Sequence, residues 1–228
     1  MIDYNIFPKK IKALFFDMDG VLYDSMPNHA FTWVESFKAA GIDFPAYDAY
    51  MNEGATGNYT IQKVFRQLGR EASEEDINRI YDHKSELMNK APLAPIMPGM
   101  QQVVADTLAA GIKVIIVTGS KQPSLISRLN DDFNIGREDI VSGFDVKNGK
   151  PDPEPYLRAL GKAACSADEA IVVENAPLGI LSARAAGLLT VAVNTGILKP
   201  EVLSEAGASL VLDSTSQLAE LWPNIIKS

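Results

Sequence analysis

Six short apolar runs, rich in Val and Ile, limit most strongly how this chain can fold. The runs are continuous in hydrophobicity rather than alternating, which is typical of strands buried on both faces of a parallel sheet. Stretches with apolar residues at helical spacing separate them, for example residues 99–111 and 176–187. This alternation predicts an α/β fold with a doubly wound, parallel, Rossmann-like sheet. The six runs cover residues 11–16, 113–118, 139–144, 170–174, 189–194 and 209–213.

Residues 25–95 interrupt this rhythm with an all-helical pattern, in which aromatic residues and Leu recur at three- and four-residue spacing. The stretch SEED at 73–76 has the form of a helix-capping box. Three prolines within 91–99 indicate a linker back to the sheet. We therefore expect an α/β core made of residues 1–24 and 96–228, with a small helical cap domain, residues 25–95, inserted after the first strand. The expected cap helices are 27–41, 57–69 and 73–89.

The composition narrows the classes of function. The 228 residues carry a net charge of −8 and show no Lys/Arg cluster, so we expect no nucleic-acid partner. The longest apolar runs, such as VIIV at 114–117, are too short to span a bilayer, and the first ten residues lack the pattern of a signal peptide. The single Cys165 has no partner for an internal disulfide. We expect a cytoplasmic monomer with a small-molecule substrate and no membrane partner.

Polar side chains stand at the ends of three of these runs. Asp17 and Asp19 follow the first run, Thr118 ends the second, and Glu174 and Asn175 end the fourth. Ligands of open parallel sheets bind beyond the carboxyl ends of the strands, so we expect these groups to converge there. Three crowded carboxylates repel one another unless a cation lies among them. An all-oxygen ligand set favours Mg²⁺ as that cation.

The same edge of the sheet offers groups that can hold a phosphate. Lys150 lies in a loop after the third run, and the Thr118 hydroxyl with the N–H groups of Gly119 and Ser120 completes a phosphate cradle. One carboxylate is then free to act as a nucleophile and form an aspartyl-phosphate. A second carboxylate can transfer a proton. These residues predict a Mg²⁺-dependent enzyme that acts on a small phosphate substrate.

Four motifs, taken in order, give the sequence a resemblance to the haloacid dehalogenase superfamily of phosphotransferases. They are DMDGVL at 17–22, VIIVT ending at Thr118, GKPDPEPY with Lys150, and VVEN at 172–175. A D-x-D-G stretch alone is usually a surface turn, and each other motif alone is equally weak. Their joint order makes the resemblance specific, and the helical region lies where the family has its cap.

The resemblance implies a role for each matching position. Asp17 is implied to be the nucleophile and a metal ligand. Asp19 is implied to be the general acid for the leaving group and then the base for water, with its backbone carbonyl also on the metal. Thr118 and Lys150 are implied to hold the transferring phosphoryl group. The residues implied to face the Mg²⁺, directly or through water, are Glu174 and Asn175.

Within the superfamily the sequence resembles the β-phosphoglucomutase-like branch, with two departures. Mutases of that branch have Glu-Asp in the fourth motif, where this sequence has Glu174-Asn175. They also have Lys-Gly-Val-Ser-Arg in the cap, and the arginine grips the second phosphate of the sugar. The matching stretch here is EGATG, with Glu53 for the lysine and Gly57 for the arginine. Loss of a bidentate cation disfavours binding of a bisphosphate.

The two departures predict a linked change in the site. We infer that Glu53 coordinates the Mg²⁺ when the cap closes, which restores the lost charge and fills space that a sugar would need. The expected substrate is then small, with inorganic pyrophosphate as the best candidate, and the Glu/Asn pairing resembles an inorganic-pyrophosphatase offshoot of the branch. Lys84 is similar in placement to a cap lysine of that group and could hold the leaving phosphate. His29, just past the linker, either touches the substrate or packs the hinge.

Three other interpretations stay open. In the first interpretation, Glu53 is a solvated acid of the cap loop. In the second, the chain is a β-phosphoglucomutase or a sugar-phosphate phosphatase, which requires a cationic site on the cap that the sequence does not reveal. The third is a catalytically inactive phosphate-binding module; Asn175 alone motivates it, and the presence of both Asp17 and Asp19 argues against it.

Overall fold

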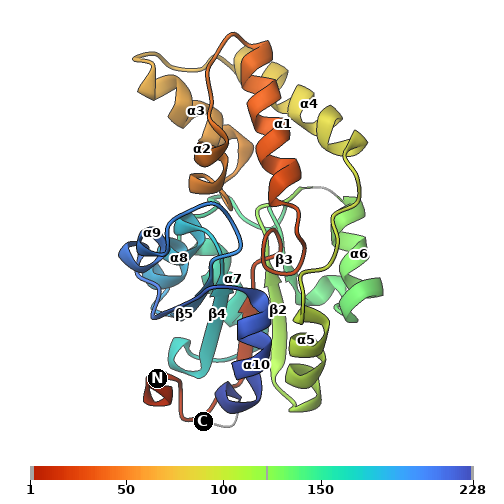
Figure 1. Ribbon diagram of the computed structural model, residues 1–228, viewed down its shortest axis with the longest axis vertical. Helices are drawn as coiled ribbons and strands as arrows, with labels where there is room; N and C mark the ends of the chain where they lie inside the picture. The colour runs from red at the N-terminus through yellow and green to blue at the C-terminus, as the bar shows by residue number, and fades with distance from the viewer. Residues whose placement is uncertain (1–2, 122, 227–228) are drawn as a thin grey trace.

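The computed structural model describes residues 3–121 and 123–226, in which a parallel sheet has the strand order β3-β2-β1-β4-β5-β6. β1 lies between β2 and β4, with Phe16 opposite Ile116 on one side and Val173 on the other. The chain therefore changes direction across the sheet at β1, and this confirms the predicted doubly wound, Rossmann-like fold (Figure 1). The strands are β1 Ala13–Phe16, β2 Lys113–Val117, β3 Ile140–Val141, β4 Ala170–Glu174, β5 Leu189–Val193 and β6 Leu210–Leu212.

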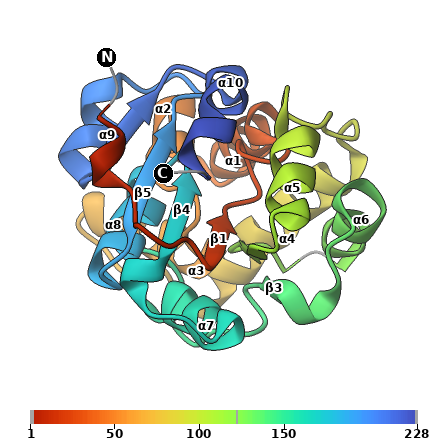
Figure 2. The same ribbon diagram turned by 90° about the horizontal axis from the view of Figure 1, so that it is seen from below.

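Helices cover both faces of the sheet because successive strand residues point to opposite sides. Leu14 and Phe16 face a cluster completed by α5, α6 and α10, whereas Phe15 faces a cluster completed by α7 and α8. Figure 2 shows α10 and α7 on opposite sides of β1 and β4. None of the helices described here is long and apolar enough to cross a membrane. The helices are α5 Met100–Ala109, α6 Pro123–Phe133, α7 Glu154–Ala163, α8 Pro177–Ala185, α9 Pro200–Ala206 and α10 Thr215–Ile225, with short 3-10 helices at Tyr4–Ile6, Arg137–Asp139 and Ala167–Glu169.

Four helices between β1 and α5, called the cap helices below, pack around a hydrophobic cluster of their own. Phe37 stacks on Trp33 and on Phe44, with ring centres 5.6 and 4.5 Å apart. The predicted capping box is confirmed, because Ser73 and Asp76 each accept a hydrogen bond from the other's backbone N–H. α2 is not predicted by the sequence, because a helix this short shows no clear periodicity. The cap helices are α1 Met26–Ala39, α2 Ala46–Met51, α3 Gly57–Gln67 and α4 Glu74–Lys90.

The two chain segments that join the cap helices to the sheet run side by side. The Asp24 N–H donates to the Pro95 carbonyl at 2.9 Å. Arg128 of α6 braces both segments, since its guanidinium lies 4.3 Å from the centre of the Tyr23 ring and donates to the Ala94 carbonyl at 2.8 Å. This arrangement fixes the connection of the cap helices to the side of the sheet that carries α5 and α6.

A buried hydrogen bond between α5 and α10 provides a test of the fold. Trp222 Nε1 donates to Thr107 Oγ1 at 3.0 Å, and both residues are fully buried. Thr107→Val keeps the shape of the side chain but leaves the indole N–H without its acceptor, so we expect the free energy of unfolding to fall by about 1–3 kcal/mol. Chemical denaturation measures the loss. In a Trp222→Phe background the same change should cost less, and an equal cost in both backgrounds would contradict this explanation.

Candidate active site

The carboxyl ends of β1, β2 and β4 bring four polar side chains to one edge of the sheet. Asp17 follows β1 directly, Thr118 follows β2, and Glu174 ends β4. Lys150 enters from the loop between β3 and α7. All four side chains belong to residues that are at most 4% exposed. The site is therefore a buried charged cluster, and its stability depends on how these charges are paired.

The ammonium group of Lys150 lies at the centre of this cluster. Nζ donates to Asp17 Oδ1 at 2.6 Å, to Glu174 Oε1 at 2.6 Å and to the Val117 carbonyl at 3.0 Å. All three N–H groups of the ammonium thus have an acceptor. Burial alone would lower the pKa of Lys150, but the charges of Asp17 and Glu174 outweigh it and raise the pKa well above its usual value. Lys150 is therefore a fixed cation.

Both carboxylate oxygens of Glu174 are occupied by hydrogen bonds. Oε1 also accepts from the Tyr156 hydroxyl at 2.9 Å, and Oε2 accepts from the N–H groups of Asn175 at 3.0 Å and Ala176 at 3.3 Å. These contacts make Glu174 the partner of Lys150, and its place at the Mg²⁺, directly or through water, stays a prediction. Sequence reasoning misses Tyr156, although the motif that supplies Lys150 also contains it, because nothing in the motif shows that its hydroxyl is buried.

Asp17 has one carboxylate oxygen that is free to react or to bind a cation. Oδ1 accepts from Lys150, whereas Oδ2 is buried and has no hydrogen-bond partner among the described residues. Burial raises the pKa of Asp17 to about 7; Lys150 opposes this rise, and the charges of Glu174 and Asp19 add to it. A divalent cation beside Oδ2 would favour the ionised carboxylate.

The oxygens left free at this edge fit the predicted Mg²⁺. Asn175 Oδ1, like Asp17 Oδ2, is buried without a partner in the described part of the chain. Mg²⁺ in proteins commonly takes one or two carboxylates and completes its shell with waters and substrate phosphates. Within residues 3–121 and 123–226, no three His, Cys, Asp or Glu side chains form a ready metal cage. The free oxygens that fit are therefore one carboxylate oxygen and one amide oxygen, with the rest of the shell from water and substrate.

Asp19 is held by the first cap helix and the residue before it. Ser25 Oγ donates to Asp19 Oδ1 at 2.6 Å, and His29 Nε2 lies 3.3 Å from the same oxygen. Burial works to raise the pKa of Asp19, but His29, the hydrogen bond from Ser25 and the charge of Lys84 outweigh it, so the pKa lies below its usual value. His29 thus contacts the predicted general acid, and Ser25 is a second residue that sequence reasoning misses.

The loop that follows α2 lies directly on the two loops of the sheet edge. Gly54 has a φ of +82°, and a Cβ atom there would lie 2.7 Å from Lys150 Cδ. A Cβ atom on Gly119 would lie 2.8 Å from the Gly54 carbonyl oxygen. Contacts this short exclude any larger side chain at either position without movement. The cap helices are therefore closed over the site.

Closure places Glu53 beside the two aspartates. Glu53 and Asp19 line the same enclosed cavity of about 50 Å³. Burial, followed by the charges of Asp19 and Asp17, raises the pKa of Glu53 well above its usual value. The structure thus brings the predicted cap acid to the site, and the like charges around it are those that a bound cation would compensate.

Lys84, predicted to hold a leaving phosphate, reaches the same cavity from α4. Its Nζ lies 3.5 Å from His29 Nδ1 and 5.6 Å from the centre of the Trp33 ring. Burial lowers the pKa of Lys84, while Glu53 and Asp19 oppose that change. A buried ammonium beside a small cavity is suited to binding an anion.

Two residues of the predicted phosphate cradle, Gly119 and Ser120, also line this cavity. The Ser120 N–H donates to Thr118 Oγ1 at 3.0 Å, so the hydroxyl and the loop backbone are oriented together. Every residue that the sequence predicts for the site therefore lies at the sheet edge or in the cap loop and helices that cover it.

Comparisons with known proteins find similar proteins along most of the chain. A family model described as haloacid dehalogenase-like hydrolase matches residues 11–187. Hexitol phosphatase A of Escherichia coli (strain K12) is 30% identical, covering 92% of this chain and 94% of that protein. "Putative pyrophosphatase PpaX" of Caldanaerobacter subterraneus subsp. tengcongensis is 27% identical, covering 93% and 94%. The structure named "Putative beta-phosphoglucomutase from Bacteroides vulgatus" is 45% identical with a TM-score of 0.91, covering 95% and 89%.

Replacing the predicted nucleophile tests the site directly. We expect Asp17→Asn to abolish phosphate release, because the amide has nearly the same shape but is a poor nucleophile. The fold should stay intact, since Lys150 keeps Glu174 and the Val117 carbonyl as acceptors. A colorimetric phosphate assay and circular dichroism measure the two outcomes. Most of the wild-type rate in a folded Asp17→Asn protein would rule out catalysis through Asp17.

Proposed function

The chain belongs to the haloacid dehalogenase-like hydrolase family and is a phosphatase or phosphotransferase of that type, and we propose that it hydrolyses inorganic pyrophosphate with the help of Mg²⁺. In this proposal residues 25–95 act as a cap domain over the α/β core. The reaction passes through an aspartyl-phosphate on Asp17. The geometry of the closed site, the free oxygens and the small cavity support the proposal.

The residues at the sheet edge can carry out the reaction in two steps. A carboxylate oxygen of Asp17 attacks one phosphorus and the bond to the bridging oxygen breaks. Asp19, in the minor protonated form that its lowered pKa leaves, gives its proton to the leaving phosphate. Water then attacks the phosphorus of the aspartyl-phosphate, Asp19 takes the proton of that water, and the second phosphate leaves with the Asp17 carboxylate restored. Thr118 holds the transferring group, and Lys150 contacts it when a phosphoryl oxygen replaces one of the three acceptors of its ammonium. Bound Mg²⁺ supplies neutralisation of the phosphate charge and orientation of the phosphoryl group.

The choice of substrate rests on one observation, the small cavity that Glu53 leaves under the closed cap. Its volume is about 50 Å³, whereas pockets for drug-sized ligands measure about 300–1,000 Å³. Lys84 lines it together with Gly119 and Ser120, so a cationic side chain reaches a space suited to a compact phosphate anion. A hexose attached to the phosphate would have to displace Glu53.

The position that carries a gripping arginine in the mutases has no room for one here. A Cβ atom on Gly57 would lie 2.2 Å from Cε2 of the Tyr81 ring. Tyr81 also lines the small cavity, so its ring fills the place from which a longer side chain would reach the second phosphate of a sugar. This packing favours a substrate without a second, remote phosphate.

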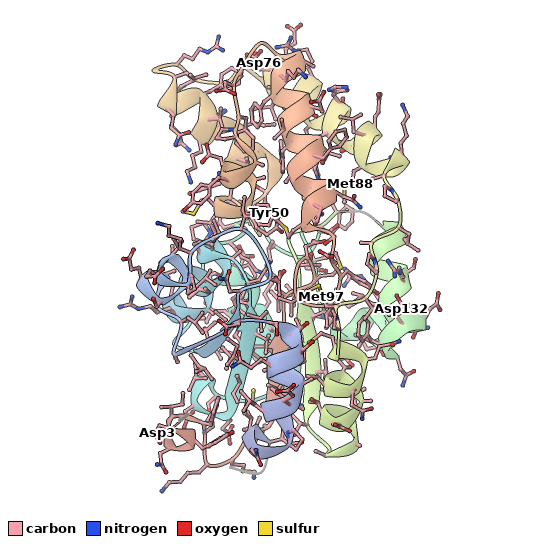
Figure 3. All side chains as sticks on the ribbon, in the orientation of Figure 1. Asp3, Tyr50, Asp76, Met88, Met97 and Asp132 are labelled. Carbon is pink, nitrogen blue, oxygen red and sulfur yellow. The ribbon has the colours of Figure 1, made fainter. Side chains whose placement is uncertain are left out.

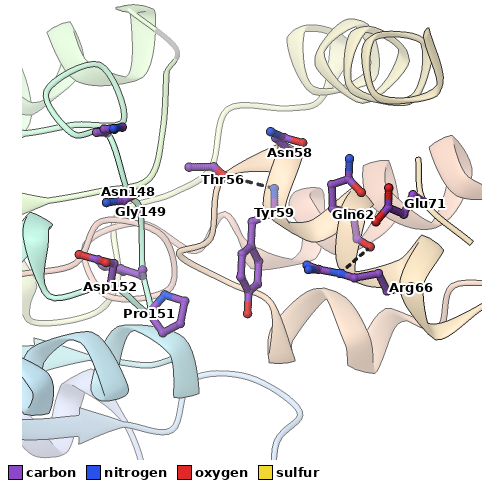
Figure 4. A pocket seen from close by; sticks show the side chains of 12 residues that line it. Thr56, Asn58, Tyr59, Gln62, Arg66, Glu71, Asn148, Gly149, Pro151 and Asp152 are labelled. Carbon is purple, nitrogen blue, oxygen red and sulfur yellow. Dashed lines mark hydrogen bonds between the residues drawn. The ribbon is translucent and has the colours of Figure 1, made fainter. Parts of the chain in front are cut away.

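A sugar phosphate is the second candidate, and a separate groove favours it. The groove has a volume of about 600 Å³ and lies between α3 and the loop of residues 147–152 (Figure 4). Arg66 and Lys147 contribute cationic side chains to its lining, and Lys150 connects its wall to the site. A phosphate ester whose sugar occupied this groove would need the cap loop to open.

A substrate panel with and without Mg²⁺ distinguishes the two candidates and tests the proposed function. The panel contains inorganic pyrophosphate, hexose phosphates, a hexitol phosphate and phosphoglycolate, and phosphate release is measured for each. We expect the highest kcat/KM for pyrophosphate. Interconversion of glucose phosphates that depends on a bisphosphate would support the mutase instead, and phosphate release from none of the substrates would support a binding module.

Removal of divalent cations should abolish turnover. The free oxygens of Asp17 and Asn175 fit a hard cation, and the carboxylates around them repel one another without it. After treatment with EDTA and dialysis we expect no phosphate release until Mg²⁺ is added. Added Mg²⁺ should also raise the melting temperature of the substrate-free protein by mass action, and less so in Asp17→Asn. Full activity in the EDTA-treated protein would contradict the metal requirement.

Glu53→Ala should reduce pyrophosphate turnover mainly through kcat. Glu53 meets the two aspartates only in the closed state, so it acts on the reacting complex rather than on the first encounter. We expect a loss of about 10²-fold in kcat, as for removal of one electrostatic partner in other sites. The same variant should gain slow activity on bulkier phosphate esters, because both volume and negative charge are removed.

Two controls sharpen this experiment. Glu53→Gln keeps the volume and removes the charge, so it separates the electrostatic effect from the steric one. Glu75→Ala removes an exposed acid of α4 that lines neither the small cavity nor the groove, and it should leave kcat unchanged. Pyrophosphate hydrolysis by Glu53→Ala at the wild-type rate would show that Glu53 is only a surface acid and would favour the sugar-phosphate candidate.

A further inference from the structure

Two side chains of the short cap helix α2 pack against the core where α8, α9 and β5 lie. Tyr50 and Met51 contact a hydrophobic cluster formed by α8, β5, α9 and Leu198. Tyr50 also packs against the hydrophobic cluster of the cap helices, so its ring joins the two clusters. Figure 3 shows Tyr50 at the junction between the cap helices and the core.

Gly196, in the core loop after β5, makes room for the ring of Tyr50. A Cβ atom on Gly196 would lie 2.6 Å from Cδ1 and 2.7 Å from Cε1 of Tyr50. Gly196 does not have a left-handed backbone conformation, so its backbone would accept alanine. Gly196 therefore lacks a side chain because the Tyr50 ring fills the space, and not because the backbone turn needs glycine.

The loop that carries Gly196 is tied to the catalytic edge of the sheet. Thr195 Oγ1 donates to the carbonyl of Gly20, three residues after the predicted nucleophile, at 2.6 Å. On the cap side, Glu53 follows Tyr50 by three residues in the loop that lies on Lys150. The contact of Tyr50 with Gly196 thus joins the loop of the nucleophile to the loop of the cap acid.

The geometry points to a clasp formed by Tyr50 and Gly196 that holds the cap helices shut and positions Glu53 for catalysis. Arg128 holds the connecting segments where α5 and α6 lie, and the clasp holds the cap helices from the β5 side (Figure 1). Tyr50 and Gly196 are positioning residues, since their effect on the reaction passes through Glu53. This inference rests on the proposed role of Glu53 for its kinetic effect, but the closure itself does not depend on the substrate.

The test is a double-mutant cycle on the clasp. Gly196→Ala places a methyl group where the ring lies and should keep the cap from closing fully, with a loss of about 10- to 100-fold in kcat, because misplacement of about 1 Å at a site can cost 10²-fold. Tyr50→Ala removes the ring and should lower kcat by itself. In the Tyr50→Ala background, Gly196→Ala should change kcat by less than about twofold, because no ring remains to clash with the methyl group.

Two control variants accompany the cycle. Tyr50→Phe keeps the ring and should behave like the wild type, since the ring and not the hydroxyl fills the space above Gly196. Gly161→Ala adds the same methyl group to a helix position with no neighbouring atom within 4 Å and should be neutral. The melting temperature of each variant shows whether a loss of rate comes from unfolding.

Acrylamide quenching of tryptophan fluorescence reports closure without any substrate. The sequence has two tryptophans; Trp222 is fully buried in the core, whereas Trp33 lines the small cavity under the cap. We expect Gly196→Ala to increase the quenching of Trp33, and to add little in the Tyr50→Ala background. This readout stays valid if pyrophosphate is not the substrate, so failure of the clasp and failure of the proposed function are distinguishable.

Either of two results would overturn the clasp. Wild-type kcat and wild-type quenching in Gly196→Ala would show that the ring contact does not control closure. An equal effect of Gly196→Ala in the presence and absence of the Tyr50 ring would show that the methyl group disturbs only its own loop.

Discussion

The buried ammonium of Lys150 is the interaction on which the rest of the site depends. Without its three acceptors a charge at this depth would cost several kcal/mol, and without the ammonium the carboxylates of Asp17 and Glu174 would repel each other at close range. The pairing requires neighbouring parallel strands, because Asp17 follows β1 and Glu174 ends β4. It also requires Gly179 in α8, since a Cβ atom there would collide with the Glu174 carboxylate. The sheet topology and the helix packing therefore position the charged groups of this one cluster.

Glycines in two loops decide how closely the cap approaches this cluster. Gly54 lies on the aliphatic part of Lys150, and Gly119 lies under the backbone of the same cap loop. With a side chain at either position the cap loop would lie farther from the core, and the cavity would be larger and more hydrated. The closed site is small because the cap loop has no side chain at Gly54 and the core loop has none at Gly119, where the two loops meet. In a site built this way, the residues that reach inward, such as Glu53 and Lys84, can meet a substrate only if it is compact.

The sequence predicts the sheet well because buried parallel strands need continuous apolar runs, and the motifs mark where those strands end. It predicts less about where side chains meet. The third run is a strand only at Ile140–Val141, because the N–H and hydroxyl of Ser142 both donate to the carboxylate of Asp145 and turn the chain. The contact of Tyr156 with Glu174, and that of Tyr50 with Gly196, join segments far apart in the chain. Neither leaves a periodic or motif signal, so only the packed structure reveals them.

The proposed site has a neutral amide, Asn175, at the sheet edge and an acid, Glu53, on the cap. The net charge of the site therefore depends on whether the cap is closed. When the cap shuts, Glu53 approaches Asp19 and Asp17, and the raised pKa of Glu53 reflects the burial and like charges it meets there. Closure is then unfavourable unless positive charge lies between the carboxylates, and Lys84 supplies only part of it. In the proposed function a bound cation would remove the repulsion, so metal binding and closure would favour each other. A substrate too large for the cavity would keep Glu53 out of the site. The cation would then lack the negative charge of the Glu53 carboxylate. Selection by size would therefore act on the rate of the chemical step as well as on binding.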